Sequence, residues 1–162
     1  MSEIPRARDA GGMDWLDFAL VYDPETRRAD MELGEDGDFV LDETPATPML
    51  ISFGADRRAR DDDELPGGTP EPSEFRARRG WPGDALDIAG RPAGSRLWLL
   101  RRAKDGELTR LMAEEWTKEA FAWVAEETAA PADITVEWVR TSVLGLRVVV
   151  DGREAAFAVR AA

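Results

Sequence analysis

Apolar and polar residues alternate at the start of the chain in the manner of short β-strands. Trp15, Leu16, Phe18, Leu20 and Tyr22 are interrupted by polar or small residues, which is a mostly period-two pattern. Turn-forming residues follow at 23–26 and at 34–37, with further apolar runs at about 29–33 and 39–41. The pattern predicts an N-terminal meander of small strands.

A different period begins after Lys104 and predicts one long amphipathic helix over about 107–128. Asp105 or Thr109 could cap its start, and Pro131 prevents the helix from continuing past Ala130. Glu114 and Lys118 stand four residues apart on the polar side. The apolar residues that recur at spacings of three and four, and that we expect to face the core, are Leu108, Leu111, Met112, Trp116, Ala120, Trp123 and Val124.

The C-terminal third has strand character throughout. Apolar residues alternate from Ile134 to Trp138, β-branched residues dominate 143–150, and a returning strand follows at 156–159. Asp151-Gly152 between the last two runs is a strong signal for a two-residue hairpin. We therefore expect an α+β fold, in which the long helix covers one face of an antiparallel sheet. The last strand is expected at a sheet edge, where it could pair with another subunit.

The sequence pattern from Thr47 to Arg58 does not decide between a helix and a strand. Thr47 as N-cap with Pro48 at the first helical position favours a helix, whereas Ile51, Phe53 and Gly54 suit a buried strand. Periodicity cannot decide so short a run, and we lean towards a helix.

The 162 residues suffice for one core, and we expect a single domain over 13–162 after a flexible leader over 1–12. A charged and Gly/Pro-rich loop at about 60–75 interrupts this domain. No apolar run approaches the roughly 20 residues that a membrane-spanning helix needs. The first residues also lack the apolar core of a secretion signal, so we expect the protein to stay in the cytoplasm where it is made.

Composition excludes much catalytic chemistry. The chain has no cysteine and no histidine, so it offers no thiolate nucleophile, no Ser-His-Asp triad and no ordinary zinc site. The acidic run from Asp23 to Glu43 lacks the spacing of a calcium loop and is better explained as a solvated face. We expect no cofactor, no metal and no catalytic residue.

The stretch from Arg78 to Lys104 reverses the charge of a protein whose net charge is −12. Seven Arg stand against two Asp between residues 76 and 102, beside two tryptophans and several glycines. Arginine and tryptophan are preferred anchors of protein interfaces, but they also serve as internal ties, and a basic aromatic strip can bind nucleic acid. The acidic chain as a whole argues against nucleic acid. The candidate interaction residues are Arg57, Arg58, Arg78, Arg79, Trp81, Asp84, Ser95, Arg96, Trp98 and Arg101.

Three blocks carry a resemblance to a known family: Asp56-Arg57-Arg58, the run from Arg78 to Asp84, and the run from Gly94 to Arg101. In this order they resemble the "TDRR", "RRGWWGD" and "GSRLWLL" blocks of the Mu-like phage baseplate proteins called gene product forty-six. The resemblance extends from about Trp15 to Val150. That family is in turn similar to the baseplate wedge and sheath-initiator proteins of T4-like and P2-like phages.

The resemblance implies a non-enzymatic subunit of a contractile tail baseplate, present in multiple copies and assembled in the host cytoplasm. Its implied partners are wedge and hub proteins, and sheath subunits at the C-terminal strand. A peptidoglycan hydrolase is the alternative, because the wider group has carried a lysozyme name, although the sequence singles out no pair of carboxylates for it. A nucleic-acid-binding module is third.

Overall fold

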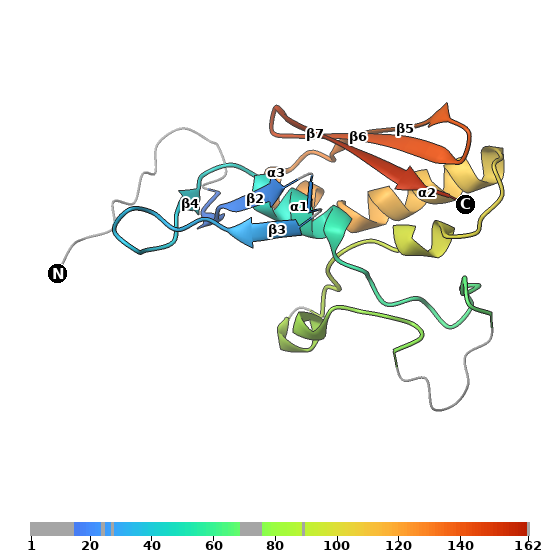
Figure 1. Cartoon of the computed structure of the whole chain (residues 1–162), viewed down its shortest axis with the longest axis horizontal. Helices are drawn as coiled ribbons and strands as arrows, with labels where there is room; N and C mark the ends of the chain where they lie inside the picture. Colours follow the sequence, from blue (N-terminus) through green and yellow to red (C-terminus); the bar gives the residue numbers. More distant parts are fainter. Residues whose placement is uncertain (1–14, 24, 27, 69–75, 89, 162) are drawn as a thin grey trace.

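A computed structural model describes residues 15–161 except 24, 27, 69–75 and 89. The leader predicted over 1–12 lies outside the described residues, as does 69–75 of the predicted loop. Figure 1 shows small strands at one end of the long axis and a helical layer packed against a three-stranded sheet at the other. The predicted α+β class is confirmed.

The N-terminal strands form two small antiparallel pairs. β2 (Leu20–Asp23) and β3 (Arg28–Met31) make a hairpin, while β1 (Asp17–Phe18) pairs with β4 (Leu41–Asp42). An isolated bridge between Leu33 and Phe39 closes the turn at 34–37. The predicted small strands are present, but their order is not that of a simple meander, because β1 pairs with β4 and not with the strand that follows it.

The ambiguous segment is a helix, α1 (Ala46–Gly54). Its capping differs from the prediction, because Pro45 is the N-cap and no side chain caps the helix. Thr47 lies inside the first turn, where its hydroxyl donates a 2.6 Å hydrogen bond to the carbonyl of Phe18. Pro48 is tolerated there because backbone N–H groups of a first helical turn have no partner within the helix. The bond from Thr47 fastens the N-terminal strands to α1.

The helix predicted over 107–128 is present as two helices, α2 (Glu107–Ala120) and α3 (Ala122–Thr128), which meet at Phe121. Neither predicted cap is used: Gly106 is the N-cap, the Asp105 carboxylate accepts a bond from the N–H of Ser142, and the Thr109 hydroxyl bonds the carbonyl of Lys104. The end before Pro131 and the pair between Glu114 and Lys118 (2.6 Å) are as predicted.

The predicted apolar stripe is right for the second half of the helical segment and wrong for the first. Trp116, Ala120 and Val124 are buried and Trp123 is half-buried, but Leu108, Leu111 and Met112 are exposed. Thr109, Ala113 and Thr117 take the inward positions of α2 instead. These small side chains allow α2 to pack closely on the sheet.

The C-terminal sheet has the order β5-β6-β7, formed by Asp133–Arg140, Val143–Val150 and Arg153–Arg160. Asp151 and Gly152 both have positive φ, as the predicted two-residue hairpin requires. β7 lies at an edge of the sheet, which confirms that part of the prediction. Leu144, Leu146, Val148 and Val150 of β6 project into the core, where two apolar clusters meet α1, α2 and the 97–100 segment.

In the described part of the chain, no helix combines the length and the apolar character needed to cross a membrane.

Candidate functional site

Backbone hydrogen bonds bring the three arginine-bearing segments together beneath α2. Asp56 and Ser95 form a parallel bridge, in which the N–H of Arg57 donates to the Ser95 carbonyl (2.9 Å) and the N–H of Ser95 to the Ala55 carbonyl (3.0 Å). The N–H of Ala59 donates to the carbonyl of Arg78 at 2.9 Å. Segments far apart in the sequence therefore form one body, the arginine cluster (residues 55–63, 76–84 and 93–101).

Gly94 is required at the point where the first and third segments meet. Its φ is +79°, a left-handed conformation that favours glycine, and a Cβ added there would lie 2.2 Å from the carbonyl oxygen of Ala55. Buried Ser95 and Arg96 follow directly. The glycine therefore permits the contact that places these two residues.

Arg79 is held between a carboxylate and an aromatic ring. Its guanidinium pairs with Asp56 and lies 4.5 Å from the centroid of the Trp98 ring. The indole N–H of Trp98 donates to the carbonyl of Arg57 at 2.8 Å. Trp98 belongs to the 3₁₀ helix η2 (Leu97–Leu100), whose four residues are all buried. Trp98 is thus a structural core residue that orients Arg79.

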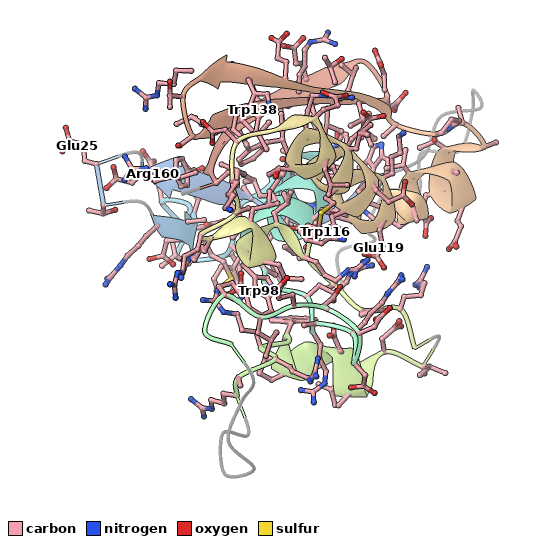
Figure 2. All side chains as sticks on the ribbon, turned by 90° about the vertical axis from the view of Figure 1, so that its right-hand side faces the viewer. Glu25, Trp98, Trp116, Glu119, Trp138 and Arg160 are labelled. Carbon is pink, nitrogen blue, oxygen red and sulfur yellow. The ribbon has the colours of Figure 1, made fainter. Side chains whose placement is uncertain are left out.

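Arg96 is buried and fully paired. Its guanidinium donates to Asp63 (2.7 Å) and Glu119 (2.8 Å) and lies 5.3 Å from the Trp116 ring centroid. Burial opposes its charge, but the bonds from both carboxylates outweigh burial and raise the pKa of Arg96. In Figure 2, Trp116 and Glu119 lie on the side of α2 that faces the cluster.

Glu119 is the carboxylate that joins the cluster to the helix. Besides Arg96 it pairs with Arg60 at 2.6 Å and with Arg57 at 3.6 Å. Burial alone would raise the pKa of Glu119, but the hydrogen bonds from Arg96 and Arg60 and the charges of Arg96 and Arg57 hold it below its ordinary value. Sequence reasoning did not name Glu119 or Asp63 as interaction residues, because nothing in the sequence showed that their carboxylates would meet the arginines.

The remaining candidate arginines differ in exposure and role. Arg78 is half-buried and donates to the carbonyls of Arg60 and Asp61, which ties the loop to the cluster. Arg58 is exposed and donates a long bond, 3.4 Å, to the carbonyl of Arg79. Arg101 is exposed at a hollow of about 420 Å³ that Trp98 and Leu65 also line. Its guanidinium has no ion pair within the described residues.

Trp81 and Asp84 stand on the other side of the cluster, around the 3₁₀ helix η1 (Pro82–Leu86). The Asp84 carboxylate accepts a 2.8 Å bond from the N–H of Ala93, which closes the loop between them. Trp81 remains 48% exposed.

Trp81 lines a groove of about 500 Å³ between this loop, α1 and the junction of α2 with α3. We call it the Trp81 groove. Its lining includes the apolar residues Pro48, Ile51 and Trp123 and charges of both signs at Arg57, Arg91, Glu119 and Glu126. An apolar lining with charged residues of both signs suits a protein side chain or segment.

The arrangement is suited to protein contact more than to chemistry. Its arginines are mostly neutralised by carboxylates of the same chain, and the shifted carboxyl in the cluster, Glu119, is held ionised. Among the described residues, no three carboxylates gather as a group that could hold a metal ion. Trp81 and Arg101 are the candidates that remain exposed at hollows.

Comparison with known proteins identifies the family. The family described as phage protein GP46 matches residues 45–156, more than half of the chain and the part that contains the arginine cluster. The chain is also 40% identical over 94 residues to the protein named "Baseplate protein gp46" of Escherichia phage Mu. That match covers 57% of this chain and 59% of the Mu protein, so it spans less than two thirds of the relative's length. No solved structure matches. Since the family covers most of the described fold, the chain belongs to the phage protein GP46 family.

Proposed function

We propose that this protein is a structural subunit of a contractile phage tail baseplate. The observation that carries the proposal is the 40% identity to the Mu protein named for the baseplate, together with membership of the same family. In this proposal several copies join each virion tail, after assembly in the host cytoplasm.

The Trp81 groove is the proposed docking site for wedge and hub proteins. Its lining is the more apolar of the two hollows at the arginine cluster, and the half-exposed Trp81 ring is an anchor of the kind that dominates binding energy in interfaces. The internal ion pairs of Arg79 and Arg96 then serve to hold the groove in shape.

The free edge of β7 is the proposed contact with the first sheath subunits. An edge strand presents unpaired backbone groups to which another strand can add, and β7 pairs only with β6 within its sheet. A subunit with a wedge-binding groove and such an edge could help to initiate sheath assembly.

The structure gives no support to the hydrolase alternative. A glycosidase needs a carboxylic acid whose pKa is raised, whereas the shifted carboxyls of the described residues, Asp23, Glu107, Glu114 and Glu119, all have lowered pKa values. We propose that the protein is not an enzyme, and a zymogram on peptidoglycan that stays uncleared by the purified protein is the expected result.

Complementation with a groove variant tests the proposed role. Trp81→Ala should reduce the number of intact tails at least about tenfold, because a central aromatic anchor is lost. Leu86→Ala is the matched control, since Leu86 is apolar, 84% exposed and part of the same short helix. Replacing Arg96 would be uninformative, because the change unpairs a buried ion network. Intact tails that lack the wild-type chain, as judged by mass spectrometry, would overturn the baseplate role.

A further inference from the structure

The N-terminal strands present an apolar sheet face that the rest of the described chain leaves open. Phe18 stands directly opposite Leu41, Leu20 opposite Met31, and Leu33 opposite Phe39. Residues opposite one another in antiparallel pairs share a face, as do residues two apart in a strand. The rings of Phe18 and Phe39 touch, with centroids 5.1 Å apart, which joins the two small pairs.

Large side chains on this face are exposed to solvent to an unusual degree. Six of them are between 44% and 62% exposed: Phe18, Tyr22, Met31, Leu33, Phe39 and Leu41. Single exposed apolar residues are normal, but a contiguous set marks an interaction surface. We call this set the N-terminal apolar face.

The opposite side and the turns of the same strands are strongly acidic. Residues 15–43 carry ten Asp and Glu against two Arg, a net charge of −8 that accounts for most of the charge of the protein. Asp17 stands directly opposite Asp42, a like-charge pair that weakens its own strand pairing. The carboxylates of the turns, among them Glu25 and Glu35, therefore border the apolar face.

This combination selects one class of occupant. A second copy that bound through the same face would place two segments of net charge −8 against each other, which is repulsive. Anionic lipid headgroups and nucleic acid are repelled for the same reason. A protein surface with an apolar centre and a rim of Lys and Arg matches both the face and its border. Figure 1 shows β7 running from the β6–β7 turn towards the end of the molecule opposite the N-terminal strands, and it is Trp15, outside the apolar face, that reaches this turn by a 3.4 Å bond to Asp151. A partner on the apolar face could therefore leave most of the β7 edge free.

We propose that the N-terminal apolar face docks on a baseplate protein whose contact surface is apolar at the centre and basic at the rim. The proposal rests on the proposed baseplate function for the setting of the partner. It adds a surface distinct from the Trp81 groove and from the β7 edge.

Site-specific photo-cross-linking tests the partner. A benzophenone amino acid replaces Leu33 or Tyr22, and the control replaces Leu108, which is apolar and 71% exposed but lies in α2 and belongs to none of the three proposed contact surfaces. Irradiation of cells that assemble the tails should join Leu33 and Tyr22, and not Leu108, to another tail protein at a peptide rich in Lys or Arg. Cross-links to a second copy of this chain, or equal cross-linking from Leu108, would overturn the proposal.

Charge reversal and polar substitution test the energetics. Glu25→Lys with Glu35→Lys in the two turns, and separately Met31→Ser with Leu33→Ser on the face itself, should each lower the amount of the chain per purified particle about tenfold. Glu115→Lys with Glu137→Lys and Leu108→Ser are the matched exposed controls, and circular dichroism checks that all variants fold. Folded variants that enter particles at the wild-type level would overturn the proposal.

The two proposals fail in different ways. If the wild-type chain is absent from purified tails, the baseplate role is wrong. The cross-link from Leu33 in cells then still shows whether the N-terminal apolar face binds another protein. If the chain is present and its N-terminal apolar face makes no cross-link, only the docking proposal falls.

Discussion

Glu119 is the residue through which the arginine cluster is fixed to α2, since Arg57, Arg60 and Arg96 all reach its carboxylate. Replacing it by Gln keeps the shape and an acceptor oxygen but removes the charge, so that Asp63 is the one carboxylate still paired with the buried Arg96. We expect Glu119→Gln to lower the free energy of unfolding by about 1–3 kcal/mol at neutral pH. Urea titration measures this, with Glu115→Gln on the exposed side of the same helix as the control.

The same variant has a defined pH signature. The pKa of Glu119 in the folded protein lies below its ordinary value of 4.5, so the carboxylate stabilises the fold above about pH 4.5. This contribution is lost as the pH falls through the folded-state pKa. The difference in stability between wild type and Glu119→Gln should therefore shrink below pH 4.5. A difference that stays constant down to pH 3 would show that the charge of Glu119 is not what stabilises the cluster.

Gly94 allows a second prediction at this scale, because both its φ and its surroundings exclude a side chain. Gly94→Ala should destabilise the protein by about 2 kcal/mol or more, since a methyl group would meet the Ala55 carbonyl. Gly90→Ala is a close control: its φ is also positive, +65°, but nothing lies within 4 Å of the added Cβ. Equal losses of melting temperature in both variants would assign the effect to backbone conformation alone.

Single residues were the hardest feature to predict from the sequence. The blocks around Arg79 and Arg96 pointed to the right part of the chain, but nothing in the sequence told whether these arginines meet their own carboxylates or a neighbour's. The partners Asp63 and Glu119 lie 33 and 23 residues from Arg96. Only the fold brings them within hydrogen-bond distance.

At the scale of elements, the pattern predicted the kinds of structure better than their faces. The period in α2 was read as a core stripe, yet Leu108 and Leu111 point to solvent and Ala113 and Thr117 point inward. Hydrophobic periodicity shows that a helix has an apolar side. It does not show whether the helix packs on the sheet through that side or through a neighbouring side of small residues. The strands were easier, because alternation and the Asp151-Gly152 turn fix register together.

The edge of β7 gives a prediction at this scale. The N–H of Ala161 donates to Ser142 across the ladder (3.0 Å), so the alternation of an antiparallel pair directs the N–H groups of Ala158 and Ala156 to the free edge. Ala156→Pro removes only an outward donor and should leave the melting temperature within about 4 °C, while it should stop the proposed strand addition by sheath subunits.

Ala155→Pro is the matched control, because its N–H faces Val148 of β6. It should destabilise the protein by about 3 kcal/mol, as expected when proline interrupts a ladder. Normal sheath assembly by a folded Ala156→Pro subunit would rule out strand addition at this edge.

At the scale of the whole molecule, the sequence predicted an α+β protein with a helical layer on a C-terminal sheet and small strands in front, and it could be placed in its family from three short blocks. The path of the chain between these parts could not be predicted. The 55–63 and 93–101 segments are joined by a parallel bridge of a single residue pair, Asp56 with Ser95. No periodic pattern in the sequence predicts this contact. Local patterns specify elements, whereas such contacts depend on the packing of the completed core.

The distribution of burial over the molecule predicts a matching distribution of stability. Every residue of β3 is exposed, whereas five of the eight residues of β6 are buried, and two-stranded pairs are only marginally stable on their own. The strands β1 to β4 should therefore open locally while the β5-β6-β7 sheet and the helices stay folded. Native-state hydrogen exchange should show amides of β2 and β3 exchanging at least about a hundredfold faster than those of β6.

If the N-terminal apolar face docks on a partner, its burial raises the free energy of this local opening. The protection of β2 and β3 should then rise towards that of β6 when the subunit is part of an assembled baseplate. Equal exchange from β3 and β6 in the isolated protein would instead mean that the N-terminal strands unfold only with the whole molecule, and that their exposed face needs no partner to hold its structure.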